Sequence, residues 1–265
     1  MAGPVRVRRP APAALNPRRL SPEGWASADA MFIRTADGDD AWESATPAAP
    51  ETWVCDLGLF RLELRRSSIG HIGIFPEQQP NWRRLRTLCG GASRPLSILN
   101  AFAYTGASTL ACLGAEGAHP VHVCHVDGSS GAVSWARRNA ALNGWDARPA
   151  RWIVDDVMTF LRREVKRGHV YDGLVFDPPA FGRGPKKEIW KLERDLAGLM
   201  AAARQLLSEK PAFILLTAHA PGMDAGHLAA SLDPLPDGQT ETMTLDLAAE
   251  SGAVLPAGYG VLRTW

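Results

Sequence analysis

The sequence has 265 residues, of which 46% are hydrophobic and 22% are charged. These proportions fit one α/β domain of ordinary size with a smaller appendage, and such a chain should bury a core without disulfide support. The formal net charge of +1 and the pI near 7.8 exclude the overall basic charge of an obligate nucleic-acid binder. A nucleic-acid substrate would therefore have to be held by a local patch.

The four cysteines, Cys55, Cys89, Cys112 and Cys124, are widely spaced and form no CxxC pair. This spacing favours buried thiols in a reducing cytoplasm over a zinc site or a disulfide framework. No apolar run approaches the roughly 18 residues of a membrane span, and the N-terminus lacks a secretory apolar segment. We therefore expect a cytoplasmic protein with no metal and no membrane partner. The sequence carries no signal for its oligomeric state.

Residues 1–24 combine five arginines with prolines and alanines, and Glu23 is their only acidic residue. Such a composition cannot bury a core and predicts a flexible basic arm. The arm could contact phosphate, have no partner at all, or act as an organelle-targeting segment.

Residues 25–90 contain short runs of Trp, Phe, Ile and Val separated by Gly, Asp and Pro. The runs at 31–34, 52–55 and 60–64 are typical of short antiparallel strands. Apolar positions 82, 85 and 88 recur at helical spacing. This part therefore predicts a small β subdomain followed by a linker helix.

Between residues 91 and 265, apolar runs alternate with amphipathic stretches, a pattern that indicates βαβ units and a mostly parallel sheet. Strands are expected at 96–100, 121–126, 151–154, 174–176 and 212–217. Helices are expected at 108–113, 129–142, 157–166 and 189–207, and residues 240–265 should form a final hairpin.

The first of these strands opens into a small-residue loop, Asn100-Ala-Phe-Ala-Tyr-Thr-Gly106. In an open α/β sheet, a nucleotide-like ligand meets the backbone at such a loop. The loop has one glycine, Gly106, rather than the several that let a backbone approach a pyrophosphate, which disfavours an NAD site. A cofactor with an amino acid end and no phosphate fits better.

Carboxylates follow the next two predicted strands. Asp127 ends the second strand, where its side chain can accept hydrogen bonds from both hydroxyls of a ribose. Asp155 and Asp156 follow the third strand, where an adenine amine would need an acceptor. Asp127 and one of this pair could instead cap the helices that follow them.

The motif Asp177-Pro-Pro-Ala-Phe181 directly follows the fourth strand. Its two prolines fix φ and lack N–H groups, so Asp177 and the carbonyl of Pro178 are presented as rigid acceptors. The ring of Phe181 can stack on a planar substrate. This arrangement suits a planar amine that must be oriented toward an electrophilic methyl group. A proline-stiffened turn would also account for the motif taken alone.

Taken in order, these motifs resemble the class I S-adenosylmethionine-dependent methyltransferases, and within them the bacterial branch related to large-subunit rRNA methyltransferases. The resemblance spans roughly residues 70–220 and rests on segments 100–106, 125–127, 133–144, 152–156 and 177–185. It implies a Rossmann-like methyltransferase fold with a mostly parallel seven-stranded sheet and a terminal hairpin, preceded by the small N-terminal β subdomain.

The resemblance also implies S-adenosylmethionine as the cofactor and a set of site residues. The cofactor would be bound by Asn100, Phe102, Tyr104, Thr105 and Gly106 at its methionine end, by Asp127 at its ribose, and by Asp156 or Asp155 at its adenine. The acceptor site would contain Asp177, Pro178 and Phe181 as catalytic residues and Pro179, Arg183 and Lys186 as substrate-binding residues.

This chain departs from its relatives in two places. Many relatives have an acidic residue near the start of the first motif, where this chain has Asn100. Relatives that methylate cytosine C5 use a nucleophilic cysteine, and residues 215–220 contain none, so a covalent mechanism would need Cys112 or Cys124. We therefore expect methyl transfer to a nitrogen.

Residues 182–194 are glycine-rich, then basic, then helical in pattern. They are typical either of a mobile lid that carries Arg183, Lys186 and Lys187 to phosphates or of a solvated helix face. His71 and His219 are interpreted as structural, because amine methylation needs little more than proton loss to water.

The sequence thus predicts an enzyme that N-methylates a base in RNA, ribosomal RNA by family analogy. One alternative is a protein or small-molecule N-methyltransferase, which the nearly neutral charge favours. The alternative of another class is a noncatalytic RNA-binding or assembly factor on the same fold.

Overall fold

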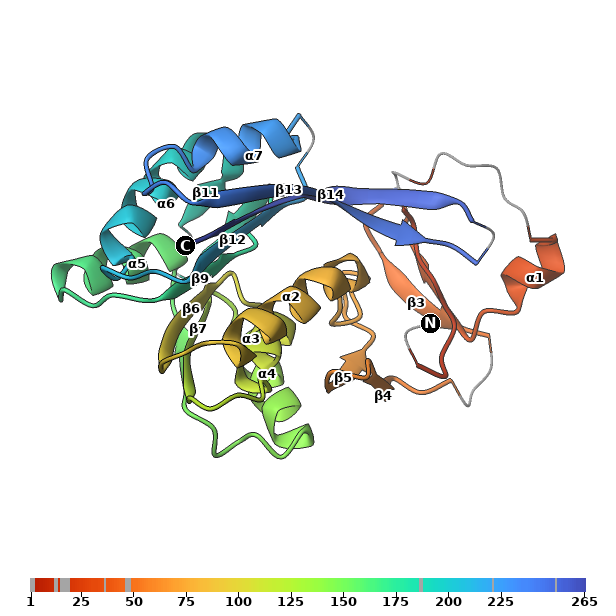
Figure 1. Ribbon diagram of the computed structural model, residues 1–265. Coiled ribbons are helices and arrows are strands. Elements are labelled where there is room, and N and C mark those ends of the chain that lie inside the picture. The colour runs from red at the N-terminus through yellow and green to blue at the C-terminus, as the bar shows by residue number, and fades with distance from the viewer. Residues whose placement is uncertain are drawn as a thin grey trace.

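The computed structural model describes residues 3–11, 14, 20–35, 37–45, 49–185, 188–220, 222–250 and 252–265. Within these ranges the central sheet has seven strands in the order β13-β14-β12-β9-β6-β7-β8 (Figure 1). Strands β12, β9, β6, β7 and β8 pair in parallel, whereas β14 runs antiparallel to both β12 and β13. The strand order reverses at β6, because β7 leaves on one side of it and β9 on the other.

The strands of this sheet are β6 (Leu96–Ala101), β7 (Val121–Asp127), β8 (Ala150–Val154), β9 (Gly173–Phe176), β12 (Phe213–Ala218), β13 (Gln239–Ala248) and β14 (Val254–Thr264). The helices beside it are α2 (Gln79–Gly90), α3 (Ala107–Leu113), α4 (Ser130–Leu142), α5 (Val157–Lys166), α6 (Leu192–Leu206) and α7 (Ala225–Ser231). The predicted mostly parallel sheet with a terminal hairpin is confirmed.

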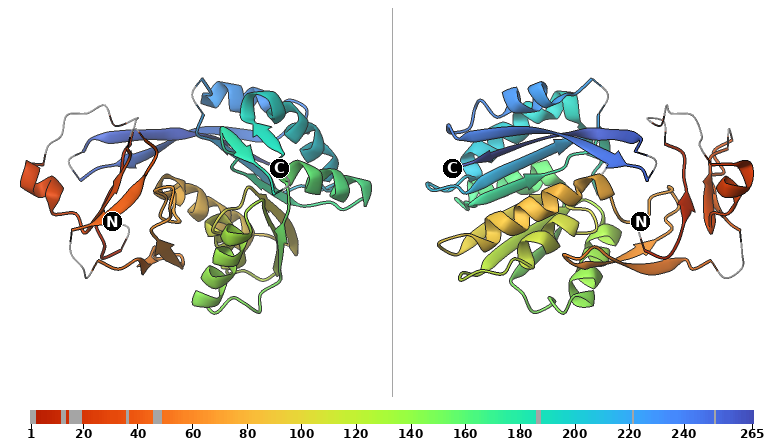
Figure 2. Two further views of the ribbon diagram at one scale, coloured as in Figure 1. Left: turned by 180° about the vertical axis from the view of Figure 1, so that it is seen from behind. Right: turned by 45° about the vertical axis from the view of Figure 1, so that its right-hand side comes forward.

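Helices cover both faces of the sheet: α2, α3 and α4 lie on one face, and α5, α6 and α7 lie on the other (Figures 1 and 2). Successive side chains of β6 point to opposite faces of the sheet. Leu99 packs in the core with α5 and α6, and Ile98 packs in the core with α2 and α3. Because these strands are buried on both sides, they read as continuous apolar runs in the sequence.

A second, small sheet contains β1 (Val7–Arg8), β2 (Ala30–Ile33) and β3 (Ala41–Ser44), and α1 (Pro22–Ala26) precedes β2. Figure 1 shows these elements on the opposite side of the molecule from α5 and α6. The expectation of a flexible arm is wrong for residues 7–8, which pair in parallel with β2. Val5 is buried and fixes this segment to the rest of the protein. The sequence did not predict this contact, because Val5 stands among Arg, Pro and Ala residues.

Strands β4 (Thr52–Asp56) and β5 (Arg61–Arg65) form a hairpin that packs against α4. The backbone N–H of Glu63 donates to the side-chain oxygen of Asn139 over 2.8 Å, and the indole N–H of Trp135 donates to the Glu63 carbonyl over 2.8 Å. Leu62 and Leu64 join the same core as α2 and α3. This part of the predicted subdomain therefore shares the core of the sheet domain.

The region after the fourth parallel strand departs from the prediction. Residues 189–191, which were expected to begin a helix, form β11 (Ile189–Lys191), which pairs with β10 (Phe181–Arg183). The helix α6 begins only at Leu192, and α7 was not predicted. The four cysteines are free and buried, as expected, and burial raises the pKa of Cys124 to about 11, which opposes thiolate chemistry.

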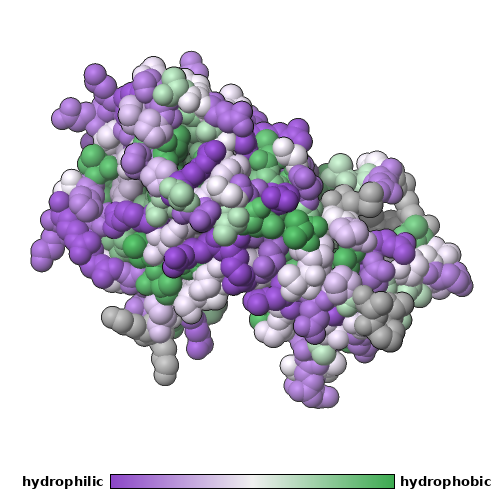
Figure 3. Space-filling view, turned by 90° about the horizontal axis from the view of Figure 1, so that it is seen from below, coloured by the Kyte–Doolittle hydropathy of each residue, from purple (hydrophilic) through white to green (hydrophobic). Residues whose placement is uncertain are grey.

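The face seen in Figure 3 is mostly hydrophilic, with its hydrophobic residues in small separate groups. It has a larger part over the central sheet and a smaller part over the N-terminal strands. Among the described helices, none has the length and apolarity that crossing a membrane requires.

Replacing Leu199, which is fully buried between α6 and the sheet, tests the packing of this face. Leu199→Ala should lower the free energy of unfolding by about 2–5 kcal/mol, because it leaves a cavity in a close-packed core. Val170→Ala is the matched control, since Val170 is 50% exposed and its truncation should cost under about 0.5 kcal/mol. Urea unfolding of both variants measures this difference, and equal midpoints would contradict the packing.

Candidate active site

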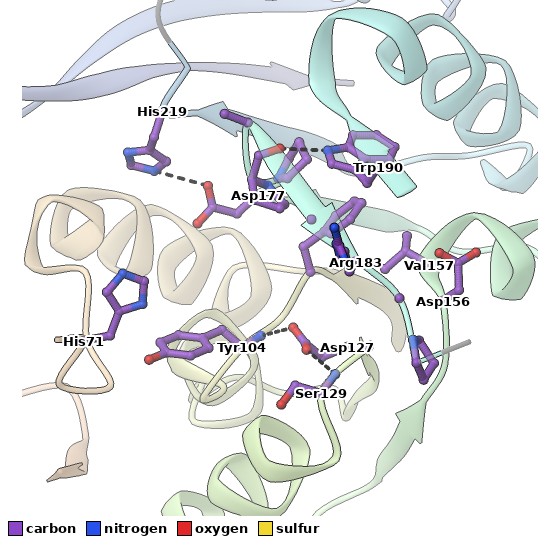
Figure 4. A pocket seen from close by; sticks show the side chains of 18 of the residues that line it. His71, Tyr104, Asp127, Ser129, Asp156, Val157, Asp177, Arg183, Trp190 and His219 are labelled. Carbon is purple, nitrogen blue, oxygen red and sulfur yellow. Dashed lines mark hydrogen bonds and ion pairs between the residues drawn. The ribbon is translucent and has the colours of Figure 1, made fainter. Parts of the chain in front are cut away.

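A cavity of about 540 Å³ opens at the carboxyl ends of β6, β7 and β9 (Figure 4). This is the point where the strand order reverses, so the loops after β6 and β9 diverge and leave room between them. Its lining comes from the predicted motifs and from further segments: His71, Phe75, Phe102, Tyr104, Asp127, Gly128, Ser129, Asp156, Val157, Asp177, Pro178, Pro179, Ala180, Gly182, Arg183, Gly184, Pro185, Trp190 and His219.

The loop after β6 is held in an unusual backbone conformation. Phe102 and Tyr104 have φ values of 57° and 48°, which residues with a side chain rarely adopt. Such strain persists only where surrounding contacts impose it, and here it places both side chains in the cavity wall. Gly106 ends the loop at φ 89° and starts α3, and a Cβ there would lie 2.9 Å from the Cβ of Ala136.

Asp127 is fixed at the end of β7 by two backbone donors. The N–H of Tyr104 donates to one carboxylate oxygen over 2.9 Å, and the N–H of Ser129 donates to the other over 2.8 Å. Burial raises the pKa of Asp127 despite these two bonds. A carboxylate can accept about four hydrogen bonds, so each oxygen keeps capacity for a further donor in the cavity.

Asp155 and Asp156 have different roles in the structure. Asp156 lines the cavity and caps α5, where one of its oxygens accepts from the N–H of Thr159 over 2.8 Å. Asp155 does not line the cavity and instead forms an ion pair with Arg163. Gly184, in the loop between β10 and β11, lies close to Asp156: a Cβ on Gly184 would be 3.2 Å from Oδ2 of Asp156. Because Asp156 lines the cavity and Asp155 does not, Asp156 is the carboxylate available to a ligand.

The residues after β9 form the opposite wall. Asp177, Pro178 and Pro179 all line the cavity, and the Asp177 carboxylate lies across it from Tyr104 and Asp127 in Figure 4. The indole N–H of Trp190 on β11 donates to the Pro179 carbonyl over 2.7 Å. Within residues 182–194, which were expected to form a mobile lid or a solvated helix face, Gly182–Arg183 and Ile189–Lys191 belong to a strand pair that is hydrogen-bonded to Pro179.

A polar network that includes Thr217 and His219 contacts the carboxylate of Asp177. One oxygen of its carboxylate accepts from the hydroxyl of Thr217 over 2.5 Å and lies 3.3 Å from Nε2 of His219. Burial lowers the pKa of His219, but Asp177, the Ala257 carbonyl and Glu77 outweigh this effect and raise it to about 9. His219, which was interpreted as structural, therefore lines the cavity, and its raised pKa favours the charged form at neutral pH.

Several predicted site residues lie outside the cavity lining. The buried side chain of Asn100 donates to Thr109, and the hydroxyl of Thr105 donates to the Gly73 carbonyl. Both side chains therefore hold the loop after β6 in place rather than line the cavity. Phe181 is 53% exposed on β10 and does not line the cavity, so its predicted stacking role rests on the sequence alone. Lys186 lies outside the described residues.

The lining residues that were not predicted as site residues include two histidines and two aromatic residues: His71, His219, Phe75 and Trp190. Phe75 packs against Tyr104, with ring centroids 5.6 Å apart, and Trp190 packs against Phe102 at 4.9 Å. In the sequence, Phe75 and Trp190 are single aromatic residues that follow a short stretch with Gly or Pro, and this pattern does not distinguish a cavity wall from a core.

The cavity fits a nucleoside cofactor with an amino acid end. Its volume falls in the range of roughly 300–1,000 Å³ that is usual for small-molecule sites. Asp127 and Asp156 supply acceptors at the ends of adjacent strands, and Phe102 and Tyr104 supply apolar surface beside them. Among the described residues, no group of three His, Cys, Asp or Glu side chains is arranged to hold a metal ion.

A solved structure with the same fold extends over nearly the whole chain. The S-adenosylmethionine-dependent methyltransferase from Agrobacterium tumefaciens is 33% identical and superimposes with a TM-score of 0.89, over 99% of this chain and 85% of its own. The chain belongs to the S-adenosylmethionine-dependent methyltransferases. The predicted family, fold and cofactor are thereby confirmed.

Curated relatives match a shorter stretch. The ribosomal RNA large subunit methyltransferase I of Tolumonas auensis is 33% identical over 162 residues, which are 60% of this chain and 38% of that protein. The ribosomal RNA large subunit methyltransferase K/L of Shewanella baltica is 36% identical over 128 residues, or 48% and 17%. The chain thus matches well under half the length of these relatives. No protein-family model matches the sequence.

The raised pKa of Asp127 predicts a pH dependence for cofactor binding. Ribose hydroxyls donate to the ionised carboxylate, so the dissociation constant for S-adenosylmethionine should be constant near neutral pH and rise as the pH falls through this pKa. Asp127→Asn should bind more weakly and show no such pH dependence. Calorimetry at several pH values tests this, with Asp155→Asn as a control that should match the wild type. An acid limb that persists in Asp127→Asn would exclude the assignment.

Proposed function

We propose that this methyltransferase transfers a methyl group to a nitrogen on a base in RNA. The observation that carries the proposal is the placement of Asp177 opposite Asp127 across one cavity, with Pro178 in the same lining. Asp127 would bind the ribose, Asp156 the adenine, and the loop with Phe102 and Tyr104 the methionine end. The methyl group would then lie between this loop and the Asp177 motif.

The acceptor motif suits a planar amino group. Pro178 and Pro179 keep the backbone rigid, so the Asp177 carboxylate and the Pro178 carbonyl can accept the two N–H bonds while the nitrogen lone pair faces the methyl group. Bound S-adenosylmethionine supplies an electrophilic methyl on a sulfonium. The acceptor nitrogen would take this methyl group with its lone pair and lose one proton to solvent, and the cofactor would leave as a neutral thioether.

Buried cysteines make the covalent route to carbon unfavourable. Cys112 and Cys124 are both buried, and neither lines the cavity. A nucleophilic cysteine must reach the base as a thiolate, whereas both thiols have raised pKa values. This supports transfer to nitrogen rather than to a ring carbon.

Arginines near the cavity support an RNA acceptor over a protein or small molecule. Arg9 donates to the Gly70 carbonyl over 2.9 Å, beside His71, and the charges of Arg9 and Arg34 help burial to lower the pKa of His71. Arg65 lies over the ring of Trp135, whose centroid is 6.3 Å from that of Tyr104. In the described part of the chain, none of these three arginines has a carboxylate partner within 4.0 Å.

These unpaired charges would bind phosphates on either side of the target nucleotide. They explain how a chain with a net charge of +1 could hold RNA through a local patch. The curated relatives are named for large-subunit ribosomal RNA, which makes that RNA the first substrate to test. Such a substrate would be met in the cytoplasm.

Removing the Asp177 carboxylate tests the acceptor site. Asp177→Ala should bind S-adenosylmethionine within about threefold of the wild type but lose methyl transfer by roughly 100-fold or more, because the amine loses its orienting acceptor. Labelled S-adenosylmethionine and an extract from cells lacking the enzyme provide the assay, with label counted in RNA, protein and small-molecule fractions. Full activity in Asp177→Ala would exclude the orienting role.

The fraction that takes up label also separates the alternatives. Label in RNA supports the proposal, and label confined to protein or small molecules overturns the RNA acceptor while keeping the chemistry. No label in any fraction would favour a noncatalytic RNA-binding or assembly factor.

Salt dependence of RNA binding tests the arginine patch. The triple variant Arg9→Gln, Arg34→Gln, Arg65→Gln should bind RNA more weakly, and the slope of log affinity against log salt should fall by about 0.7–0.9 for each phosphate that the variant no longer neutralises. A charge-matched control replaces Arg84, Arg138 and Arg194, which are already paired with carboxylates, and should keep the wild-type slope. Equal reductions of the slope in both triple variants would show that only net charge matters.

A further inference from the structure

We propose that His219 is a positioning residue for methyl transfer, whose imidazolium, held by Glu77 and the Ala257 carbonyl, fixes the ionised Asp177 carboxylate in its amine-accepting orientation. The proposal rests on the function proposed above and assigns a role to a residue outside the Asp177-Pro178-Pro179 motif. His219 directly follows β12 and lines the same cavity as Asp177.

The partners of His219 favour protons on both ring nitrogens. Nδ1 lies 2.5 Å from the Ala257 carbonyl, which only accepts, so Nδ1 must carry a hydrogen. Nε2 lies 3.3 Å from Oδ1 of Asp177, which also accepts when ionised. The Gln78 amide has two N–H groups; it donates one to Thr217 over 3.1 Å, and its nitrogen lies 3.4 Å from Nε2. The contact of Nε2 with Asp177 is the shorter of its two contacts and is strengthened by charge, so we assign the ring as an imidazolium.

A second chain of hydrogen bonds directs the Thr217 hydroxyl at the same carboxylate oxygen. The amide of Asn81 donates to the side-chain oxygen of Gln78 over 2.8 Å, which turns the Gln78 nitrogen toward Thr217. Since Thr217 accepts from Gln78, its own proton is free to reach Asp177 over 2.5 Å. Gln78, Asn81 and Thr217 are all buried, so the network is fixed rather than solvated.

This network occupies one oxygen of Asp177 and leaves the other for the substrate. Both Thr217 and His219 approach Oδ1, and among the described residues no donor to Oδ2 is found. A free carboxylate would rotate about its terminal torsion, whereas two donors on one oxygen hold it in a single orientation. The amine-accepting oxygen is thereby placed before substrate arrives, which is the condition for rate gain by positioning.

Charges on the surrounding elements keep His219 protonated. Glu77 is 7% exposed, and its Oε1 lies 3.8 Å from Nδ1 of His219. Burial raises the pKa of Glu77, and the charge of Arg9 acts to lower it. His219 also lines a smaller cavity of about 370 Å³, together with Asp246 and Tyr259. The centroid of the Phe75 ring lies 6.2 Å from that of the His219 ring.

The test compares pH profiles of methyl transfer for the wild type, His219→Gln and Glu77→Gln. The wild-type kcat should fall above pH about 9 as His219 loses its proton. His219→Gln keeps a donor but not the charge, so kcat should fall roughly 10- to 100-fold, with an unchanged cofactor affinity and no alkaline limb from this group. Glu77→Gln should keep the plateau kcat and move the alkaline limb to lower pH.

His227→Gln is the matched control, since His227 also pairs with an aspartate, Asp224 at 2.9 Å, but is exposed and does not line the cavity. It should match the wild type in every profile. Wild-type kcat with an unchanged alkaline limb in His219→Gln would overturn the proposal.

An independent readout uses NMR of the imidazole carbons in the full chain. His219 should titrate well above the ordinary value near 6.5, and Glu77→Gln and Asp177→Asn should each lower that titration point. A His219 that titrates near 6.5 would overturn the proposal even if the enzyme is active. If the titration is as expected but RNA takes up no methyl groups, the ion pair stands and the RNA acceptor fails.

Discussion

The reversal of strand order at β6 is the constraint on which the site depends. Because β7 and β9 pair with opposite edges of β6, the loops that leave their carboxyl ends turn apart and enclose a cavity. Asp127 ends one neighbour and Asp177 follows the other, so residues 50 positions apart in the sequence face each other. The parallel register of these strands sets the distance between the wall with Asp127 and the wall with Asp177.

Contacts around the cavity make each wall rigid in a different way. On the wall with Asp127, backbone N–H groups of Tyr104 and Ser129 fix the carboxylate, and the left-handed residues Phe102 and Tyr104 store local strain. On the wall with Asp177, prolines and the Trp190 bond fix the backbone, while Thr217 and His219 contact the carboxylate. Preorganisation on both sides is what a reaction limited by alignment requires.

Much of the parallel sheet could be predicted because its strands are buried on both faces and appear as apolar runs between helices. The aspartates Asp127, Asp156 and Asp177 could be predicted because each stands at or just after the end of such a run. Two strand pairings could not be predicted. Val7–Arg8 pairs with β2, a partner distant in the sequence, and β10 and β11 are short strands in a segment rich in Gly and Pro.

The same limit applies to the site residues that were missed. His219, Glu77 and Thr217 come from separate parts of the fold, and only the fold shows that they meet at Asp177. Asn100 and Thr105 were expected to contact the cofactor, but their hydrogen bonds point into the core, to Thr109 and to the Gly73 carbonyl. A motif thus identifies the loop, whereas side-chain direction depends on the neighbours that the fold supplies.

A crystal structure of the protein with S-adenosylhomocysteine tests the central claim most directly, since the claim is that one cavity joins the cofactor to the acceptor motif. The account predicts ribose hydroxyls on Asp127, adenine beside Asp156, and the sulfur facing Asp177 and the Pro178 carbonyl. A ligand bound with its ribose away from Asp127, or with its sulfur turned from Asp177, would contradict it.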